Sequence, residues 1–269
     1  MNFTLIGDEG KPWRRAIAIA AGVLLLLAVL IFGRAERQLM SSAEVKTVQE
    51  RGVLRIGVIP DMPGVELERE LGRRIAAKLL PEADPESRAV FRDVTTMTAG
   101  TSIDDGTVDM VIAHMASQMS AKYTYSDSYY TEECILVVKS GTSAFALKNF
   151  TVGYIQSNRL RKTAEDITLK EYLAAGGSQS MEKRAYASYS DMLAALDRGE
   201  IGGAVLPRQV FNELRTQYPI TETTLVIGTI DYKVMCPGDS TVLSELASIV
   251  IRQMRDSGEL AELYAQYGW

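Results

Sequence analysis

Hydrophobic residues gather in one uninterrupted run near the start of the chain and then alternate with polar residues to its end. Residues 16–33 (AIAIAAGVLLLLAVLIFG) contain no charged side chain. Eighteen residues in an α-helix span about 27 Å, which is close to the hydrocarbon thickness of a bilayer. The run therefore predicts a transmembrane helix at residues 14–34, with a cytoplasmic tail at 1–13 before it and a linker helix at 35–51 after it.

A cleaved signal peptide is the alternative for this run, and the residues that follow it favour an uncleaved anchor. The apolar region of a signal peptide is normally shorter and is followed at once by a small-residue cleavage site. Here the charged residues Arg34, Glu36 and Arg37 follow instead. A slight excess of basic residues before the run points the N-terminus into the cytoplasm. We therefore expect a single-pass protein of the inner membrane, with its C-terminal part in the periplasm or extracellular space.

Beyond residue 51, short β-rich runs alternate with segments of helical periodicity. Val53–Ile59 and Val108–Ala113 are nearly continuous apolar runs, which are typical of buried strands. Glu66–Leu80 between them carries apolar side chains at helical spacing. A second series of this kind begins at Thr151, after the linker-like stretch Ser140–Ser143. Strands that alternate with helices predict an α/β fold with a parallel sheet.

The linker and a later return of the chain predict two lobes, the first of which is discontinuous. We expect lobe 1 to comprise residues 52–140 and 228–269, and lobe 2 to comprise residues 141–227. Residues 224–227 and 232–236 are predicted to be separate strands on the two sides of the return. Ligands of such sheets bind at the carboxyl ends of the strands, so the crevice between the lobes is the predicted site.

The charge of the chain argues against a nucleic-acid partner. The net charge is −5, although residues 1–37 carry five Lys or Arg against three Asp or Glu. The remainder is therefore more acidic still. Nucleic-acid binding relies on clustered Lys and Arg, and no such cluster follows residue 37.

The sequence carries few of the residues that catalysis and metal binding use most. His114 is the only histidine, and Cys134 and Cys236 are the only cysteines. A structural zinc site of the usual kind and a Ser-His-Asp triad are therefore not indicated. We expect no metal, no cofactor and no enzymatic activity. In an oxidising compartment Cys134 and Cys236 can form a disulfide, and two buried free thiols are the equally weighted alternative.

Four segments, in order along the chain, carry a family pattern. They are the opening strand Gly52–Val58, the turn and strand Asp105–Ala113, the motif Tyr125–Tyr130 (YSDSYY) and the stretch Leu147–Gly153. Together they resemble the bacterial extracellular solute-binding proteins, family 3, of the polar amino-acid-binding type. The resemblance implies a two-lobed periplasmic-binding-protein type II fold after the transmembrane helix. It also implies a membrane-anchored binding protein that takes a small polar or anionic, amino-acid-like solute and passes it to the permease of an ABC-type importer.

The residues that hold an amino acid in this family are largely replaced. The family usually places an Arg before the Tyr-Ser-Asp motif, where its guanidinium grips the ligand's α-carboxylate. Here Lys122 is the only cation in residues 116–123, and Gly202 and Pro207 stand where a second-lobe carboxylate is expected. This departure supports an alternative function, in which the domain has lost amino-acid binding and serves as a sensory or scaffolding subunit of a membrane complex.

Six residues are candidates for ligand binding because of their places in the resemblance. Ser157 and Asn158 precede a helix predicted from about Arg159, and the N–H groups of a helix N-terminus attract anions. Plain N-capping is the alternative for both. A structural role is the alternative for the histidine that ends the third strand, and a solvated surface position is the alternative for the lysine. The full set is Asp61, His114, Met115, Lys122, Ser157 and Asn158.

Overall fold

The computed structural model describes residues 17, 19–21, 33–60, 62, 64–95, 97–142, 151–156, 163–177 and 181–269. The predicted tail at 1–13 and most of the predicted transmembrane helix at 14–34 lie outside these ranges. Within the described part of the chain, no helix combines the length and the apolar character that crossing a membrane requires.

The predicted linker at 35–51 is helical but interrupted. Residues 33–40 are helical, and α2 (Ala43–Arg51) begins after a break at residues 41–42. Ser42 caps α2, because its side chain accepts a hydrogen bond from the backbone N–H of Val45. Gly52 ends the helix with φ 72°, a left-handed conformation that glycine adopts without strain.

Eight strands form one mixed sheet in the order β2-β1-β3-β8-β4-β7-β5-β6. They are β1 (Leu54–Val58), β2 (Ala89–Asp93), β3 (Met110–Met115), β4 (Thr124–Lys139), β5 (Thr151–Ile155), β6 (Glu182–Tyr186), β7 (Gly203–Pro207) and β8 (Ile220–Cys236). Pairing is parallel at the two ends, between β1 and its neighbours and between β5 and its neighbours. The central pairs β3–β8, β8–β4 and β4–β7 are antiparallel. The expectation of a parallel sheet is therefore confirmed only for the two ends.

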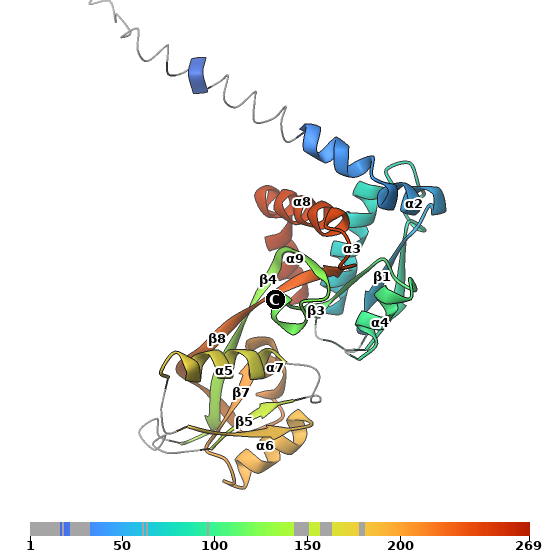
Figure 1. Ribbon diagram of the computed structural model, residues 1–269. Helices are drawn as coiled ribbons and strands as arrows, with labels where there is room; N and C mark the ends of the chain where they lie inside the picture. The colour runs from blue at the N-terminus through green and yellow to red at the C-terminus, as the bar shows by residue number, and fades with distance from the viewer. Residues whose placement is uncertain are drawn as a thin grey trace, which may run out of the picture.

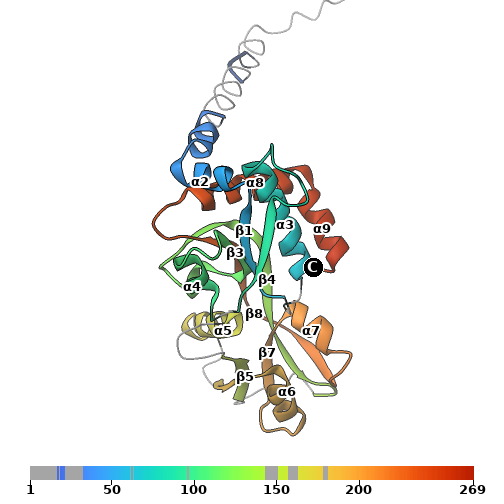
Figure 2. The same cartoon turned by 90° about the vertical axis from the view of Figure 1, so that its right-hand side faces the viewer.

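Helices gather around each end of this sheet and give two lobes (Figure 1). The upper lobe in the figure holds β1–β3 with α2, α3 (Val65–Leu79), α4 (Ala99–Asp104), α8 (Val242–Ser257) and α9 (Glu259–Tyr267). The lower lobe holds β5–β7 with α5 (Ala164–Ala174), α6 (Tyr189–Asp197) and α7 (Arg208–Leu214). In the turned view, α5 and α7 lie on opposite sides of β7 (Figure 2).

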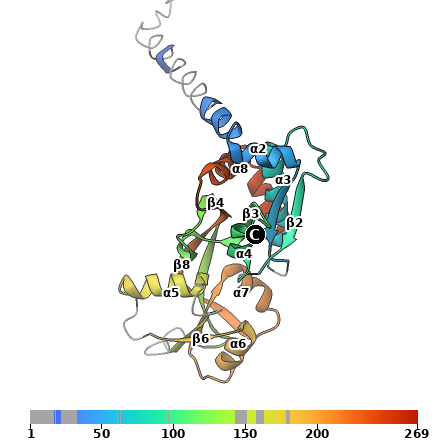
Figure 3. The same ribbon diagram turned by 45° about the vertical axis from the view of Figure 1, so that its right-hand side comes forward.

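The two long strands β4 and β8 join the lobes (Figure 3). They pair from Thr124 opposite Cys236 to Lys139 opposite Ile220. The sequence predicts separate strands at 224–227 and 232–236, which is wrong, because β8 continues without interruption through both. The lobe boundary predicted at 140–141 follows the last residue of β4, and the one predicted at 227–228 falls inside β8.

The core of the upper lobe confirms the helical pattern that the sequence shows. Leu67, Leu71, Ile75 and Leu79 follow one another at intervals of four residues along α3, and all four side chains are fully buried. This stripe packs with β1 and α8 in one hydrophobic cluster. A second cluster lies in the lower lobe around Met192 and Leu196 of α6. The first cluster also includes Val152, Ile167 and Leu169 of the lower lobe, so it continues across the joining strands, whereas the second cluster lies within the lower lobe.

Candidate functional site

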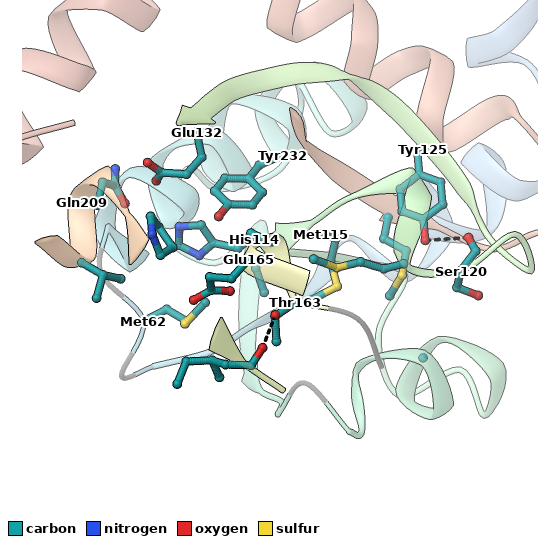
Figure 4. Close-up of a pocket in the computed structure, with 18 of the residues that line it drawn as sticks. Met62, His114, Met115, Ser120, Tyr125, Glu132, Thr163, Glu165, Gln209 and Tyr232 are labelled. Atoms are coloured by element: carbon teal, nitrogen blue, oxygen red, sulfur yellow. Dashed lines mark hydrogen bonds between the residues drawn. The ribbon is translucent and has the colours of Figure 1, made fainter. Parts of the chain in front are cut away.

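A cavity of about 690 Å³ lies between the two lobes (Figure 4). The upper lobe and the joining strands contribute residues of β3, β4 and β8, and the lower lobe contributes residues of α5, α6 and α7. Three of the predicted ligand-binding residues, His114, Met115 and Lys122, line this cavity. The other three, which are Asp61, Ser157 and Asn158, lie outside the described residues.

His114 occupies an irregular point of β3. Its φ is 53°, a left-handed conformation uncommon for residues other than glycine. The register of β3 against β8 shifts between Val111 and Met115, so a bulge falls at this place. A bulge changes the direction in which a side chain points. The strand is therefore distorted where His114 meets the cavity.

Aromatic rings enclose the imidazole of His114. It stacks on the indole of Trp269, with ring centroids 5.2 Å apart, and meets the ring of Tyr232 edge-on at 4.5 Å. Burial lowers the pKa of His114 to about 3, because desolvation disfavours the charged form. His114 is therefore neutral near pH 7 and offers the cavity a ring face and no positive charge.

A buried carboxyl group supports this histidine from behind. Glu68 of α3 has no exposed surface, and its Oε1 accepts hydrogen bonds from the His114 backbone N–H at 2.8 Å and from the Tyr129 hydroxyl at 2.5 Å. Burial raises the pKa of Glu68 to about 8, and the two donors only partly oppose this rise. Glu68 therefore stays largely protonated at neutral pH and holds the distorted end of β3 to α3.

Two further carboxyl groups line the cavity itself. Glu132 of β4 is 1% exposed, and Glu165 of α5 is 2% exposed. Oε1 of Glu132 accepts the backbone N–H of Arg208 at 3.0 Å, and Oε1 of Glu165 accepts the hydroxyl of Tyr189 at 2.6 Å. These hydrogen bonds orient both acids but bring them no counter-ion.

Burial controls the ionisation of these two acids as well. It raises the pKa of Glu132 to about 7, against the opposing effect of backbone N–H donors at the start of α7. It also raises the pKa of Glu165, which the Tyr189 hydroxyl opposes. The guanidinium of Arg208 pairs with Glu133 and Glu222 instead. Among the described residues, no ion pair reaches Glu132 or Glu165.

The cavity is chemically divided along its length. Glu132, Glu165, His114 and Tyr232 gather at one end, and Met115 lies toward the other with Tyr125 and Ser120 (Figure 4). At that second end the Tyr125 hydroxyl is engaged, since it donates to the Ser120 carbonyl at 3.0 Å. One end can therefore hold a charged or polar group, and the other can cover an apolar body.

Lys122 lines the cavity but is not free to balance these acids. Its Nζ lies 2.5 Å from Oδ2 of Asp104, and its side chain is 63% exposed. The hydrogen bond to Asp104 raises the pKa of Lys122. This geometry agrees with the alternative prediction of a solvated surface lysine, here paired with Asp104. It does not agree with a lysine that binds the carboxylate of a ligand.

The disulfide considered for Cys134 and Cys236 is wrong, because both are buried free thiols. Cys134 lies opposite Gly228, whereas Cys236 lies opposite Thr124, ten residues away along β4. At about 3.3 Å per residue the two are on the order of 30 Å apart, whereas bridged residues have Cα atoms within about 7 Å. In the described ranges, no group of three or more His, Cys, Asp or Glu is placed to hold a metal ion.

The helix at the second-lobe side of the cavity begins later than the sequence predicts. α5 starts at Ala164, with Thr163 as its N-cap, whereas the prediction starts the helix at about residue 159. The Thr163 side chain accepts the N–H of Asp166 at 3.2 Å and donates to the Ile155 carbonyl at 2.6 Å. Thr163, which also lines the cavity, therefore has the capping position that Ser157 and Asn158 were expected to share.

Comparison with known proteins places this geometry in a family. A sequence profile of the bacterial extracellular solute-binding proteins, family 3, matches residues 62–269. No curated protein sequence matches the chain. Among solved structures, similar folds include three amino-acid-binding proteins, each below 25% identity, so that they show the fold alone.

One of them is the amino acid ABC transporter substrate-binding protein AbpA from Streptococcus pneumoniae, bound to L-arginine. It has 18% identity and a TM-score of 0.60, over 82% of this chain and 97% of that one. The probable amino-acid ABC transporter extracellular-binding protein YtmK from Bacillus subtilis has 16% identity and a TM-score of 0.63, over 80% and 97%.

The third is an ancestral amino acid-binding protein, a precursor of cyclohexadienyl dehydratase. It has 15% identity and a TM-score of 0.60, over 84% of this chain and 99% of that one. The profile covers more than half of the chain, and the two-lobed mixed sheet with a cavity between its lobes agrees with it. The chain therefore belongs to the bacterial extracellular solute-binding proteins, family 3, and has their periplasmic-binding-protein type II fold.

Proposed function

We propose that this chain is an extracytoplasmic solute-binding protein, anchored in the membrane by residues 16–33, which holds a small polar solute between its lobes. The cavity of about 690 Å³ carries this proposal, because residues of both lobes line it. A volume of this size falls in the range of small-molecule sites. The solute then passes to a membrane permease, as in the ABC-type importers to which the family belongs.

The joining strands support a hinged mode of binding. β4 and β8 are the long connections between the lobes, and their register is irregular at several points, including the step from Cys134 to Ile135. Domain closure about a few such residues is how two-lobed proteins enclose their ligands. When the lobes close around a solute, Glu132 of β4 and Glu165 of α5 contact it from different elements.

A second function is favoured by one observation. Lys122, the cation nearest to the place where the family carries its carboxylate-binding Arg, is paired with Asp104. The chain can accordingly be a domain that has lost amino-acid binding and serves as a sensory or scaffolding subunit of a membrane complex. The ligand test below separates the two functions.

The test is a thermal-shift and calorimetric screen of the full chain in mild detergent against amino acids, amines and small carboxylates. A ligand at 100 times its Kd adds about 2.7 kcal/mol to the free energy of unfolding, or roughly 5–10 °C in Tm for a protein of this size. Recovery of the ligand unchanged supports binding without catalysis, and a product shows an enzyme. If no compound binds, the solute-binding proposal is wrong and the second function is favoured.

A matched pair of variants locates the site. Val210 of α7 lines the cavity, whereas Val226 of β8 is 41% exposed and lies outside it. We expect Val210→Trp to abolish the thermal shift by filling the cavity, and Val226→Trp to retain it. Equal shifts in both variants would place the ligand elsewhere.

A further inference from the structure

The acidic end of the cavity indicates which solute the cleft selects, an inference that rests on the proposed function. Among the described residues that line the cavity, Glu132, Glu165 and Glu213 are acidic and Lys122 is the only cation. Because Lys122 is already paired with Asp104, it does not neutralise the two buried acids. Burying an unpaired carboxylate is costly, so a site that retains two of them is suited to a cationic partner.

The hydroxyl of Tyr232 gives an independent indication at the same place. Tyr232 is 4% exposed and lines the cavity, and no hydrogen bond joins its hydroxyl to another described residue. Burial raises the pKa of this phenol well above the usual value, and the nearby Glu132 and Glu165 add to the rise. Figure 4 shows the phenol oxygen of Tyr232 in the same region as the two carboxyl groups, beside the ring of His114.

Ring faces and sulfur atoms complete a surface that suits an organic cation. The aromatic rings of His114 and Tyr232 lie at the acidic end, where Tyr189 donates to Glu165. Met115 lies toward the other end, and Met235 is the strand partner of Tyr125. Aromatic faces attract cations, most strongly where water is excluded. Methionine side chains adapt to apolar bodies of varied shape.

We propose that the cleft binds a primary amine with an apolar body, whose ammonium group sits between Glu132 and Glu165 and whose ligand body extends toward Met115. Charge-assisted hydrogen bonds to the two carboxylates hold the ammonium. An α-carboxylate on the ligand is not required and weakens binding, because it would meet the same two acids. The preferred solute is thus an amine and not an α-amino acid.

Four compounds that share one phenylethyl body test this. They are phenethylamine, phenylalanine, 3-phenylpropionate and 2-phenylethanol, titrated calorimetrically into the full chain in detergent at pH 7.5. A hexyl set of the same kind (hexylamine, 2-aminoheptanoate, heptanoate and hexanol) controls for the shape of the body. We expect each amine to bind at least tenfold more tightly than the amino acid, acid or alcohol of its set.

Two variants and a matched control assign the effect to the carboxyl groups. Glu132→Gln and Glu165→Gln keep the oxygen that accepts from Arg208 or Tyr189, so both retain the local hydrogen bond. Each is expected to weaken amine binding tenfold or more. Glu171→Gln, at an exposed position of α5, is expected to change it less than twofold. A Tm in each variant at least as high as that of the unsubstituted chain shows that the fold is intact.

The outcomes separate this inference from the proposed function. Residues 157–162, which include Arg159, Arg161 and Lys162, lie outside the described residues, and for this reason anionic compounds belong in both sets. If an amino acid or a carboxylate binds more tightly than its amine, the inference is wrong while the solute-binding function stands. If neither set binds but another compound of the wider screen does, the inference is also wrong. If nothing binds in any experiment, both proposals fail.

Discussion

The imidazole of His114 lies flat on the indole of Trp269, with 9° between the two ring planes. Trp269 follows α9, whereas His114 is the penultimate residue of β3, so the stack joins two residues 155 positions apart in the sequence. The indole also contacts Tyr130 at 4.4 Å, edge to face. This group of rings backs the cavity wall and connects the acidic end of the cleft to the upper lobe.

Gly64 packs closely against the ring of Trp269, so a substitution at Gly64 tests the ring stack. A Cβ added at Gly64 would lie 1.9 Å from the Trp269 ring, and the φ of Gly64 is 76°. Gly106 has a similar φ of 70°, but a Cβ added there meets nothing within 4 Å. We expect Gly106→Ala to cost about 1 kcal/mol of unfolding free energy from backbone strain alone, and Gly64→Ala to cost about 2–4 kcal/mol.

Denaturant unfolding measures both costs, and tryptophan fluorescence in a Trp13→Phe background, where Trp269 is the remaining tryptophan, reports whether the indole moves. A shift in emission is expected for Gly64→Ala and none for Gly106→Ala. Equal losses of stability in the two variants would show that the contact between Gly64 and Trp269 contributes nothing beyond strain.

The raised pKa of Glu68 predicts that the free energy of unfolding falls as pH rises. Its pKa is about 8 in the folded protein and near 4.5 when unfolded, so the folded state binds more protons between these values. The free energy of unfolding then decreases with rising pH, by up to about 1.4 kcal/mol per pH unit between pH 5 and 8. Glu132 and Glu165 contribute in the same direction, because burial raises their pKa as well.

The variant Glu68→Gln measures how much of this pH dependence comes from Glu68 alone. Glutamine keeps an oxygen for the His114 N–H and the Tyr129 hydroxyl but does not ionise. We expect the loss of unfolding free energy between pH 5 and 8 to be smaller in this variant by about 1 kcal/mol or more. Glu262→Gln, at an exposed position of α9, serves as the control with an unaltered pH profile. An unaltered profile in Glu68→Gln would contradict the raised pKa.

Amine binding should strengthen as pH rises from 5.5 to 8. The amine is charged throughout this range, whereas Glu132, with a pKa of about 7, must lose its proton to meet it. Affinity is expected to rise by up to about tenfold per pH unit below pH 7 and then to level off. Around Glu132, the groups Tyr130, Cys134, Arg208 and Tyr232 change charge above this range and His114 changes charge below it. Burial also raises the pKa of Glu165, so its ionisation acts in the same direction as that of Glu132.

Calorimetry in buffers of different ionisation enthalpy measures the protons released on binding. Near pH 6.5 the release should exceed half a proton per amine, and Glu132→Gln should reduce it. No release at any pH would mean that the amine does not meet an acid of raised pKa.

The proposed membrane anchor predicts how the full chain fractionates. Residues 16–33 have the length to span a bilayer. The chain is expected to remain in the membrane pellet after an alkaline carbonate wash, whereas a chain lacking residues 1–37 moves to the supernatant. The intact mass decides between anchor and signal peptide, because an uncleaved anchor retains residues 1–33 and a cleaved one does not.

Much of the fold is predictable from the sequence because apolar periodicity dominates it. The stripe of α3 and the runs that form β1, β3 and β5 give the correct elements. β8 shows where this reasoning stops. Gly228 and Asp231 interrupt its apolar pattern, yet the strand continues because β4 supplies hydrogen-bond partners on both sides of the interruption. Tertiary pairing here overrides local pattern.

The site is predictable only in part, because its chemistry comes from residues with ordinary local roles. Glu132 looks like one acid of an exposed pair in the run TEEC, and only the pleat of β4 shows that it faces inward while Glu133 faces out to Arg208. Glu165 looks like a first-turn acid that favours the dipole of α5. Tertiary burial turns both into cavity groups, and a single sequence does not show burial of that kind.

A crystal structure of the protein with its tightest-binding amine tests most directly whether the cleft holds the ammonium group between Glu132 and Glu165. We predict density between the lobes, with the ammonium nitrogen within hydrogen-bonding distance of both Glu132 and Glu165 and the apolar body beside Met115. Density at any other surface, or an amine in the cleft whose nitrogen points away from both carboxyl groups, would contradict the proposed amine site.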